Sequence, residues 1–395
     1  MNETPLSMPG SFENIDITAL KRRVVYISWM SLSDKVLRDW YIDYLIEKGV
    51  SVEYWDVTPL LLGERRIGSK ETDFLRTPRT YREIRGLLSR PENYDAYYVI
   101  LVSYCGASTQ LYRLLSKHGC RTLYIDWGHH PTTANRWRRL FSNPIVFAKD
   151  AYNSLKARTY RRLKLIKPFD TILVAGEIPL AGRHYAARVV PINLIDYDNC
   201  IKARIDGKQL VRERYAVFLD NNLPFQFDIR TDGLGAINAY NYFRSLNRFF
   251  DLLEMKCGIK VVIAAHPTAN YGEQTFLGRR IYRGRTPDLV NYADFVVAHH
   301  STAYCYAILN YKPILFVYTD EMKQLYKNTR VRNIIDSATY LDATILNVDE
   351  IAHGDQIVIR DVNRGRYEEY KYGYLTTHAS EHSTTQKIFW SEINA

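Results

Sequence analysis

Two apolar runs in the second half of the chain each end abruptly in polar residues whose types suit phosphate binding. Residues 260–265 lead into His266-Pro267, and residues 295–298 lead into His299-His300-Ser301-Thr302. An imidazole can donate a hydrogen bond to a phosphate oxygen, and the backbone N–H groups behind a Ser or Thr helix cap attract an anion. We therefore expect a nucleotide phosphate to contact the following residues: His266, Pro267, His300, Ser301 and Thr302. The structural alternatives are a histidine bonded to a nearby carbonyl and a helix cap without a ligand.

Two carboxylates also follow apolar runs and could carry acid–base chemistry. Asp220 ends the run 215–219, where it could act as a base towards a hydroxyl group or as a nucleophile. Glu177 follows the run 171–175 and is the alternative acid or base. For Asp220 the structural alternative is an Asp-Asn turn with no catalytic role.

A group of four arginines in seven residues, from Arg279 to Arg285, could hold a carboxylate or a diphosphate through paired hydrogen bonds. We assign Arg283 and Arg285 to the site, although Thr286-Pro287 is also typical of a helix start. Asp196-Tyr197-Asp198 has the form of a metal-binding Asp-x-Asp motif, but a linker is the favoured interpretation. Adjacent histidines on a strand point to opposite faces, so no metal site is predicted.

The elements that would position these residues alternate between strand and helix. Apolar runs typical of strands occur at 24–29, 52–55, 97–103, 121–125, 171–175 and 189–192, and again at 215–219, 261–265, 295–298 and 314–317. A helix is expected over 33–48, and the pattern lapses between 196 and 214, which we interpret as a hinge. Strands separated by helices form parallel sheets. We therefore predict an α/β fold with one Rossmann-like domain over 1–200 and another over 210–395, whose tyrosine-rich tail could cross back to the first domain.

The net charge of +10 is concentrated between residues 135 and 167, where ten Lys or Arg residues stand against one acid. Aromatic and aliphatic residues are interleaved with these basic ones. Such a stretch suits an anionic membrane surface or polymer, while a solvated helix face is the alternative. No zinc-finger, RNA-recognition or helix-turn-helix signature accompanies the charge, so no nucleic-acid partner is expected.

Cysteine usage and hydropathy favour a cytoplasmic protein. The five cysteines are scattered without a Cys-x-x-Cys pair, so we expect reduced thiols rather than disulfides or a zinc site. The N-terminal residues 1–17 lack the apolar core of a signal peptide, and no stretch approaches the ~18 apolar residues of a membrane span.

Two Rossmann-like halves joined by a hinge are typical of GT-B glycosyltransferases, whose domains face a central cleft, and also of epimerases and some binding proteins. The order strand–Asp220, strand–His266-Pro267, strand–Ser301-Thr302 resembles bacterial sialyltransferases and polysialyltransferases and the related Kdo transferases. This resemblance covers roughly residues 210–320. It implies a catalytic carboxylate at Asp220 and phosphate contacts at His266, Ser301 and Thr302. The acidic motif of that family is two acids and a glycine, whereas Asp220-Asn221-Asn222 stands here.

The resemblance implies a metal-independent glycosyltransferase of capsule or lipopolysaccharide assembly. It would transfer an acidic nonulosonic-type sugar, Kdo or sialic-acid-like, from a CMP-linked donor to a glycan or lipid-linked glycan, without a further cofactor. Segment 135–167 would hold it on the anionic inner membrane, and residues 126–131 and Glu177 would line the acceptor side. One alternative is a GT-B transferase that uses a UDP-, GDP- or dTDP-sugar. Another is a non-catalytic nucleotide- or carbohydrate-binding protein.

Overall fold

The computed structural model describes residues 23–63, 69–126, 128–131, 144–226, 235–299, 301–327 and 329–395, with the backbone alone over 144–150. The chain divides into two compact units. The first comprises Met1–Ile125, Tyr152–Thr171 and Trp390–Ala395, and the second comprises Asp126–Ala151 and Ile172–Phe389.

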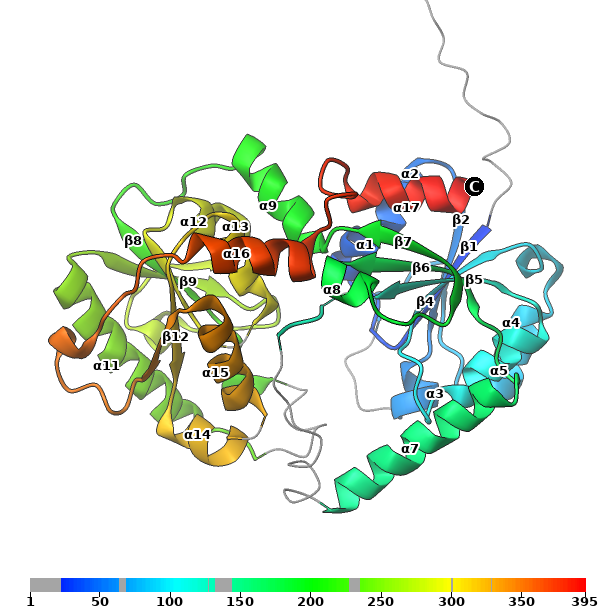
Figure 1. The fold of residues 1–395 in the computed structure, drawn as a ribbon, viewed down its shortest axis with the longest axis horizontal. Helices are drawn as coiled ribbons and strands as arrows, with labels where there is room; N and C mark the ends of the chain where they lie inside the picture. Colours follow the sequence, from blue (N-terminus) through cyan, green and yellow to red (C-terminus); the bar gives the residue numbers. More distant parts are fainter. Residues whose placement is uncertain are drawn as a thin grey trace, which may run out of the picture. The chain divides into compact units, whose positions relative to one another are not determined.

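A seven-stranded sheet is built from the first half of the chain in the order β3-β2-β1-β4-β5-β6-β7 (Figure 1). Its strands are β1 (Arg23–Ser28), β2 (Ser51–Asp56), β3 (Leu75–Arg76), β4 (Tyr97–Leu101), β5 (Arg121–Asp126), β6 (Phe169–Ala175) and β7 (Ala186–Ile192). The pairs from β3 through β5 are parallel. Every residue of β4 is buried, as expected for a central strand of a sheet covered on both faces.

A six-stranded sheet follows in the order β10-β9-β8-β11-β12-β13, and all of its strand pairs are parallel. Its strands are β8 (Tyr215–Leu219), β9 (Lys260–Ala265), β10 (Ile281–Arg283), β11 (Phe295–Ala298), β12 (Ile314–Tyr318) and β13 (Thr344–Asn347). Numbered from β8, this order is the 3-2-1-4-5-6 order of the Rossmann fold. The chain therefore leaves β8 first towards one side of the sheet and later returns to its other side at β11.

Helices connect the strands of both sheets. They are α1 (Asp34–Asp39), α2 (Ile42–Glu47), α3 (Thr58–Leu62), α4 (Tyr81–Leu88), α5 (Thr109–Lys117), α7 (Pro144–Arg162), α8 (Glu177–Leu180), α9 (Ile195–Asp206), α11 (Ala239–Cys257), α12 (Thr286–Tyr292), α13 (Cys305–Leu309), α14 (Asp320–Tyr326), α15 (Arg330–Leu341), α16 (Arg364–Tyr370) and α17 (Thr385–Asn394). Helix α11 illustrates which local features of the sequence make a segment helical and end it. Its buried Leu246, Phe250 and Leu253 recur at helical spacing, the Asn238 side chain caps its start, and Gly258 ends it in the left-handed conformation.

The single helix expected over 33–48 is wrong, because the segment forms α1 and α2 with a break between them. Tyr41 adopts a left-handed conformation with φ of 60° at the break. Trp40, Tyr41 and Ile42 are all buried. One face of a continuous helix cannot bury three consecutive residues, so the break allows all of them to pack in the core.

The hinge expected between 196 and 214 is also wrong over its first half, which forms α9. Tyr197, Cys200 and Ala203 are buried at helical spacing, and Asp196 and Asp198 lie in the first turn, where the helix dipole favours negative charge. Asp196 Oδ1 accepts a hydrogen bond of 2.6 Å from Tyr306, and Asp198 Oδ2 accepts one of 2.7 Å from the backbone of Thr385. The Asp-x-Asp segment is thus the start of a packed helix.

The predicted fold class, an α/β chain with two Rossmann-like parallel sheets, is confirmed. The strands of one sheet fall within 1–200 and those of the other within 210–395. All five cysteines are free thiols, as expected. Within the described ranges, no helix combines the length and apolar character that crossing a membrane requires.

Candidate functional site

Three neighbouring strand ends lie at one edge of the second sheet. β8 lies between β9 and β11, with Leu219 opposite both Ala264 and Ala298. Because the strands are parallel, residues 220, 266 and 299–301 all follow strands at the carboxyl edge. This edge, between β8 and β11, is the topological switch point at which open α/β sheets bind their ligands.

Asp220 is a buried carboxylate that joins the ends of β8 and β9. Its Oδ2 atom accepts hydrogen bonds from the His266 backbone N–H at 3.0 Å and from the Tyr271 hydroxyl at 2.8 Å. Its Oδ1 atom accepts one from the Asn222 N–H at 2.9 Å. Burial raises the pKa of Asp220, while these hydrogen bonds oppose the shift. The bond between positions 220 and 266 confirms that the two predicted residues converge.

His266 is held in one tautomer by the loop that follows it. The Thr268 backbone N–H donates to Nδ1 at 3.2 Å, and the Thr268 hydroxyl lies 2.8 Å from the same atom. A nitrogen that accepts from a backbone N–H carries no proton, so the proton of the neutral ring is on Nε2. The ring therefore presents Nε2–H as a hydrogen-bond donor, the polarity that a phosphate oxygen requires. Pro267 follows as an exposed residue of the same turn.

Tyr271 is fixed beside Asp220 by hydrogen bonds and by contacts of its ring. Its hydroxyl lies 2.8 Å from Asp220 Oδ2 and 3.0 Å from Asn222 Oδ1, and its ring packs edge-on against Phe243 and Phe276. Burial, followed by the charge of Asp220, raises the pKa of Tyr271 well above its usual value. The hydroxyl therefore stays protonated and serves as a donor.

Ser301 is the helix cap that the sequence predicts. Its Oγ accepts a hydrogen bond of 3.3 Å from Ala303 N–H, at the start of a 3-10 turn, Thr302–Tyr304, that continues into α13. His300 lies outside the described residues. His299 is buried, donates from Nδ1 to the Val317 carbonyl at 2.6 Å and lies 2.9 Å from the Tyr242 hydroxyl. Burial lowers the pKa of His299 to about 4, so this histidine is a neutral part of the core.

The four arginines of 279–285 do not form one cluster, which corrects the prediction. Arg279 and Arg280 precede β10 and make salt bridges with carboxylates of α11 and of the segment before β8. Arg283 is the last residue of β10, lies opposite Ala265, and donates through Nε to the carbonyl of Ala269 in the His266 loop at 3.4 Å. Arg285 forms a salt bridge of 3.1 Å within α12. Of the four, Arg283 belongs to the cluster around His266.

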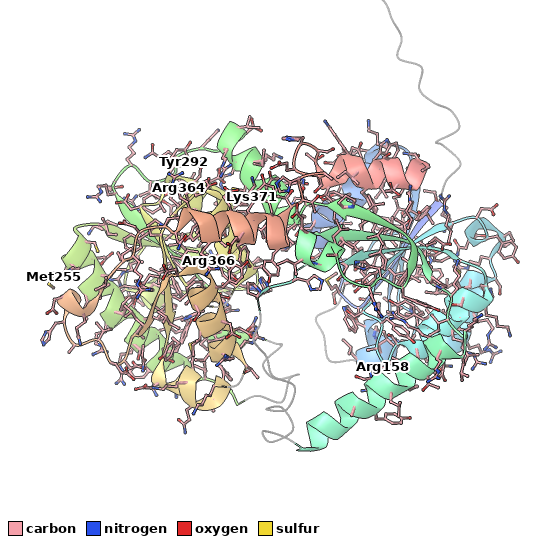
Figure 2. The ribbon with its side chains drawn as sticks, in the orientation of Figure 1. Arg158, Met255, Tyr292, Arg364, Arg366 and Lys371 are labelled. Atoms are coloured by element: carbon pink, nitrogen blue, oxygen red, sulfur yellow. The ribbon has the colours of Figure 1, made fainter. Side chains whose placement is uncertain are left out.

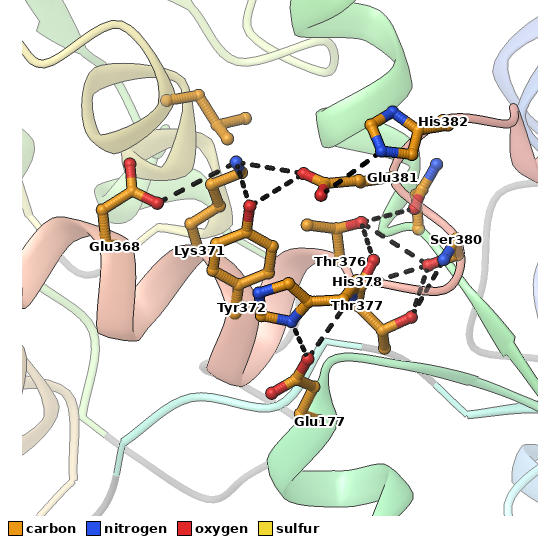
Figure 3. A network of polar contacts seen from close by, with 12 residues as sticks. Glu177, Glu368, Lys371, Tyr372, Thr376, Thr377, His378, Ser380, Glu381 and His382 are labelled. Atoms are coloured by element: carbon orange, nitrogen blue, oxygen red, sulfur yellow. Dashed lines mark hydrogen bonds and ion pairs between the residues drawn. The ribbon is translucent and has the colours of Figure 1, made fainter.

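Glu177 begins α8 at the carboxyl end of β6 and pairs with a histidine from the C-terminal tail (Figure 3). Its Oε1 atom lies 2.5 Å from Nδ1 of His378 and 3.3 Å from the backbone N–H of the same residue. The hydrogen bond from His378 lowers the pKa of Glu177, which is therefore ionised near neutral pH. The His378 ring is stacked on Tyr372 at 3.9 Å with an angle of 7° between the rings.

The segment after β5 also carries a carboxylate–histidine pair. His129 Nε2 lies 3.0 Å from Asp126 Oδ1, and this contact raises the pKa of His129. The next residue, His130, reaches the helical segment behind Ser301, with Nδ1 at 3.4 Å from the Tyr304 hydroxyl and 2.9 Å from that of Tyr370. Burial lowers the pKa of His130 to about 4.

The described residues contain no group of three or more histidine, cysteine, aspartate or glutamate side chains that could hold a metal ion. Nε2–H of His266 and the Arg283 guanidinium form a set of hydrogen-bond donors for an anion. In addition, two carboxylates at strand ends of the first sheet, Asp126 and Glu177, each bind an imidazole. Sequence reasoning did not assign His378 or Tyr372, because nothing in the chain near either residue points to Glu177.

No family model matches the chain, and no curated protein matches it. Among solved structures it is similar to the wall teichoic acid polymerase TagF, with 10% identity, coverage of 94% of this chain and 89% of that one, and a TM-score of 0.49. It is also similar to the spinosyn forosaminyltransferase SpnP, with 11% identity, 94% coverage of both chains and a TM-score of 0.42. A third is the UDP-GlcNAc 2-epimerase of Methanocaldococcus jannaschii, with 10% identity, coverage of 88% and 98%, and a TM-score of 0.43. No substrate or mechanism follows from similarities at this level.

Proposed function

We propose that the chain is a glycosyltransferase that binds a nucleotide-activated sugar at the carboxyl edge of the second sheet. The observation that carries the proposal is the fixed Nε2–H donor of His266 at the switch point, beside Arg283 on the neighbouring strand. An imidazole donor and a guanidinium can together bind a phosphate, and the N-terminus capped by Ser301 adds backbone N–H groups at the same edge.

These groups would act on the leaving nucleotide. In the transfer, an acceptor oxygen bonds to the sugar carbon, the bond from that carbon to the phosphate oxygen breaks, and its electron pair stays on the phosphate. Hydrogen bonds from His266 and Arg283 would stabilise that charge. Donors fixed before the reaction are effective because they need no reorganisation, and removal of one such donor typically costs about 3 kcal/mol of transition-state stabilisation.

The contacts of Asp220 favour a positioning role over the role as base or nucleophile that the sequence suggested. Both of its oxygens accept hydrogen bonds from the chain itself, and one donor is the backbone N–H of His266. In our proposal Asp220 holds the His266 loop against β8. A different group must then accept the proton of the acceptor.

The favoured donor is a CMP-linked acidic sugar of the Kdo or sialic-acid type, with a bacterial surface glycan as acceptor. Its support is the resemblance in strand-end residues, Asp220, His266-Pro267 and Ser301-Thr302, together with the common sheet edge from which they project. A UDP-, GDP- or dTDP-sugar is the alternative donor. Metal independence is part of the proposal, because side chains and backbone N–H groups can neutralise the departing nucleotide.

Isothermal titration calorimetry of the full chain with CMP, UDP, GDP and dTDP tests the donor. We expect CMP to bind most tightly, and H266A to weaken its binding by about 10- to 100-fold, the effect of losing a hydrogen bond to a charged group. H118A, at an exposed histidine at the end of α5, is the matched control and should bind like wild type. Tighter binding of UDP, GDP or dTDP would select the alternative donor, and failure of all four nucleotides to bind would refute the nucleotide site.

A non-catalytic nucleotide- or carbohydrate-binding protein would share the fold and the binding. Release of free nucleotide from the bound sugar nucleotide separates the two classes. A transferase should release it with acceptor, and slowly with water, whereas a binding protein should return the donor intact.

We also propose that the basic segment 135–167 rests on an anionic membrane surface. In its described part, Tyr152, Leu155 and Leu163 expose 63–66% of their area. Arg158 (labelled in Figure 2) and Arg162 are exposed residues of the same helix, three residues after Leu155 and four residues after Arg158 respectively, so they border this apolar face. The opposite side of α7 is buried at Ala157, whose carbonyl accepts a hydrogen bond from Tyr104. An exposed apolar face bordered by basic residues suits an anionic interface.

Vesicle sedimentation tests this placement. R158Q/R162Q should weaken binding to phosphatidylglycerol vesicles by about 30-fold, since each basic residue near such a surface contributes about 1 kcal/mol. The matched control is R364Q/R366Q, which removes two exposed arginines of α16. Equal partition of the wild type to neutral and anionic vesicles would contradict the electrostatic part.

A further inference from the structure

The pair formed by Glu177 and His378 depends on a close approach of two glycines. Gly176 has φ of +86°, and a Cβ there would lie 2.5 Å from the Gly373 carbonyl oxygen. A Cβ on Gly373 would in turn lie 3.1 Å from Ile178. The turn between β6 and α8 therefore packs directly on Lys371–Leu375, a single π-helical turn that extends α16. Such turns are rare and frequently occur at functional sites.

The imidazole of His378 is held by two neighbouring side chains and is otherwise exposed to solvent. Glu177 binds its Nδ1 and its backbone N–H, and Tyr372 stacks on its face. Tyr372 is itself held, because its hydroxyl donates to Glu381 at 2.9 Å and accepts from Lys371 at 3.0 Å (Figure 3). The His378 side chain is nevertheless 68% exposed, and that of Glu177 is 45% exposed.

The tautomer of His378 is opposite to that of His266. A carboxylate can only accept, so Nδ1 of His378 carries the proton, and Nε2 of the neutral ring is left with a lone pair. His266 presents a donor and suits a phosphate, whereas His378 presents an acceptor and suits the removal of a proton. Two contacts connect His378 to the segment behind Ser301. The His378 ring stacks on Tyr372, and the hydroxyl of Tyr370, two residues before Tyr372, lies 2.9 Å from the hydroxyl of Tyr304.

We propose that His378 accepts the proton of the attacking acceptor hydroxyl and that Glu177 positions its ring for this step. The inference rests on the proposed glycosyltransferase function. As the acceptor oxygen bonds to the sugar carbon, its proton moves to Nε2 of His378, and the electron pair of the broken bond leaves with the nucleotide phosphate. The negative charge of Glu177 stabilises the imidazolium that forms. His378 is then the catalytic residue and Glu177 a positioning residue.

The first experiment needs no substrate. Nitrogen-15 NMR of histidine-labelled full-length chain gives the tautomer of His378. We expect the Nδ1–H tautomer in the wild type and in E177Q, because the amide oxygen of glutamine still accepts from Nδ1–H. In E177A, which removes this acceptor, the preference for the Nδ1–H tautomer should be lost. An Nε2–H tautomer in the wild type, or an unchanged Nδ1–H preference in E177A, would overturn the proposal.

The second experiment measures turnover of the sugar nucleotide that calorimetry selects. H378N should lower kcat by about 10²- to 10⁴-fold with nucleotide affinity unchanged. E177Q should also lower kcat with nucleotide affinity unchanged, because the amide keeps the hydrogen bond to Nδ1 but loses the charge that stabilises the imidazolium. H382N, at a histidine of the same tail that is 89% exposed, is the matched control and should behave like wild type.

The outcomes separate this inference from the proposed function. Wild-type turnover by H378N or by E177Q would overturn the inference while nucleotide binding stands. Loss of nucleotide affinity in H378N would also overturn it, because His378 would then belong to the donor site. If the wild type binds none of the four nucleotides, the proposed function fails and the inference fails with it, whichever tautomer NMR shows.

Discussion

Replacing Asp220 by Asn separates the two roles that its position allows. The substitution keeps the shape of the side chain but turns one acceptor oxygen into an NH2 donor. Whichever oxygen is replaced, the new donor faces a backbone N–H, that of Asn222 on one side or that of His266 on the other. One buried N–H therefore loses its acceptor.

Two contributions of opposite sign determine how far D220N changes the stability of the His266 loop. Leaving a buried donor unsatisfied costs about 1–3 kcal/mol, and more when the lost acceptor was charged. Against this, the amide relieves the burial of a charge, the same effect that raises the pKa of Asp220. The lost hydrogen bond outweighs the relief, because three donors converge on this carboxylate. We expect D220N to destabilise the His266 loop by about 2 kcal/mol, a ~30-fold change in its opening equilibrium.

Amide hydrogen exchange measures that opening directly. In D220N, protection at the amides of His266 and Asn222 should fall by about 30-fold, with nucleotide affinity falling along with it. D251N is the matched control: this carboxylate on α11 is 60% exposed in its salt bridge with Arg279, so the variant should leave both amides unchanged. If D220N keeps wild-type protection and nucleotide affinity but loses turnover, Asp220 is the base or nucleophile and the positioning argument fails.

Three further predictions follow from described contacts. R283Q should weaken CMP binding by about tenfold in titration calorimetry. Its melting temperature should stay within about a degree of the wild type, since the one described hydrogen bond of Arg283 is a long one to a carbonyl. Unchanged CMP affinity would show that Arg283 does not belong to the site. G176A should lower the melting temperature measured by calorimetry, because a methyl group overlaps the backbone of residue 373, whereas G86A, in open space on α4, should leave it unchanged or raise it. The folded-state pKa of about 4 for His299 lies below its unfolded value, so its contribution to stability is present above pH ~6.5 and is lost as pH falls towards 4. Denaturation at pH 7 and pH 5 should show a loss of about 2 kcal/mol from this residue that H299Q lacks, and equal pH dependence in both proteins would contradict the buried neutral ring.

Four strands of the second sheet, β8, β9, β11 and β12, were predictable because each is an apolar run, whereas the short edge strands β10 and β13 were not predicted. The run 215–219 is β8, and the run 260–265 is β9. Parallel sheets place consecutive strand ends at one edge, so Asp220 and His266 could be expected to meet, and a hydrogen bond joins them. The cap at Ser301 was predictable for the same local reason, since a cap is defined by residues within one turn of it.

Other outcomes depended on packing that no local pattern contains. The arginines of 279–285 are close in sequence, yet the strand β10 between them carries two to one edge of the sheet and two to the other. The break at Tyr41 exists because three consecutive side chains are buried in the core. In both places the local sequence pattern predicted one arrangement, and packing in the tertiary structure produced another.

By itself, the amino-acid sequence determined the alternation of strands and helices, the two Rossmann-like sheets with most of their strands, and the strand ends at which a phosphate-binding site could form. These features come from hydrophobic periodicity and turn-forming residues, which act over a few positions of the chain. Only the tertiary structure decided the tautomer of His266, the buried state of Asp220 and the pairing of Glu177 with His378. The last two residues are 201 positions apart, and they meet because Gly176 and Gly373 carry no side chain that would keep their backbones apart.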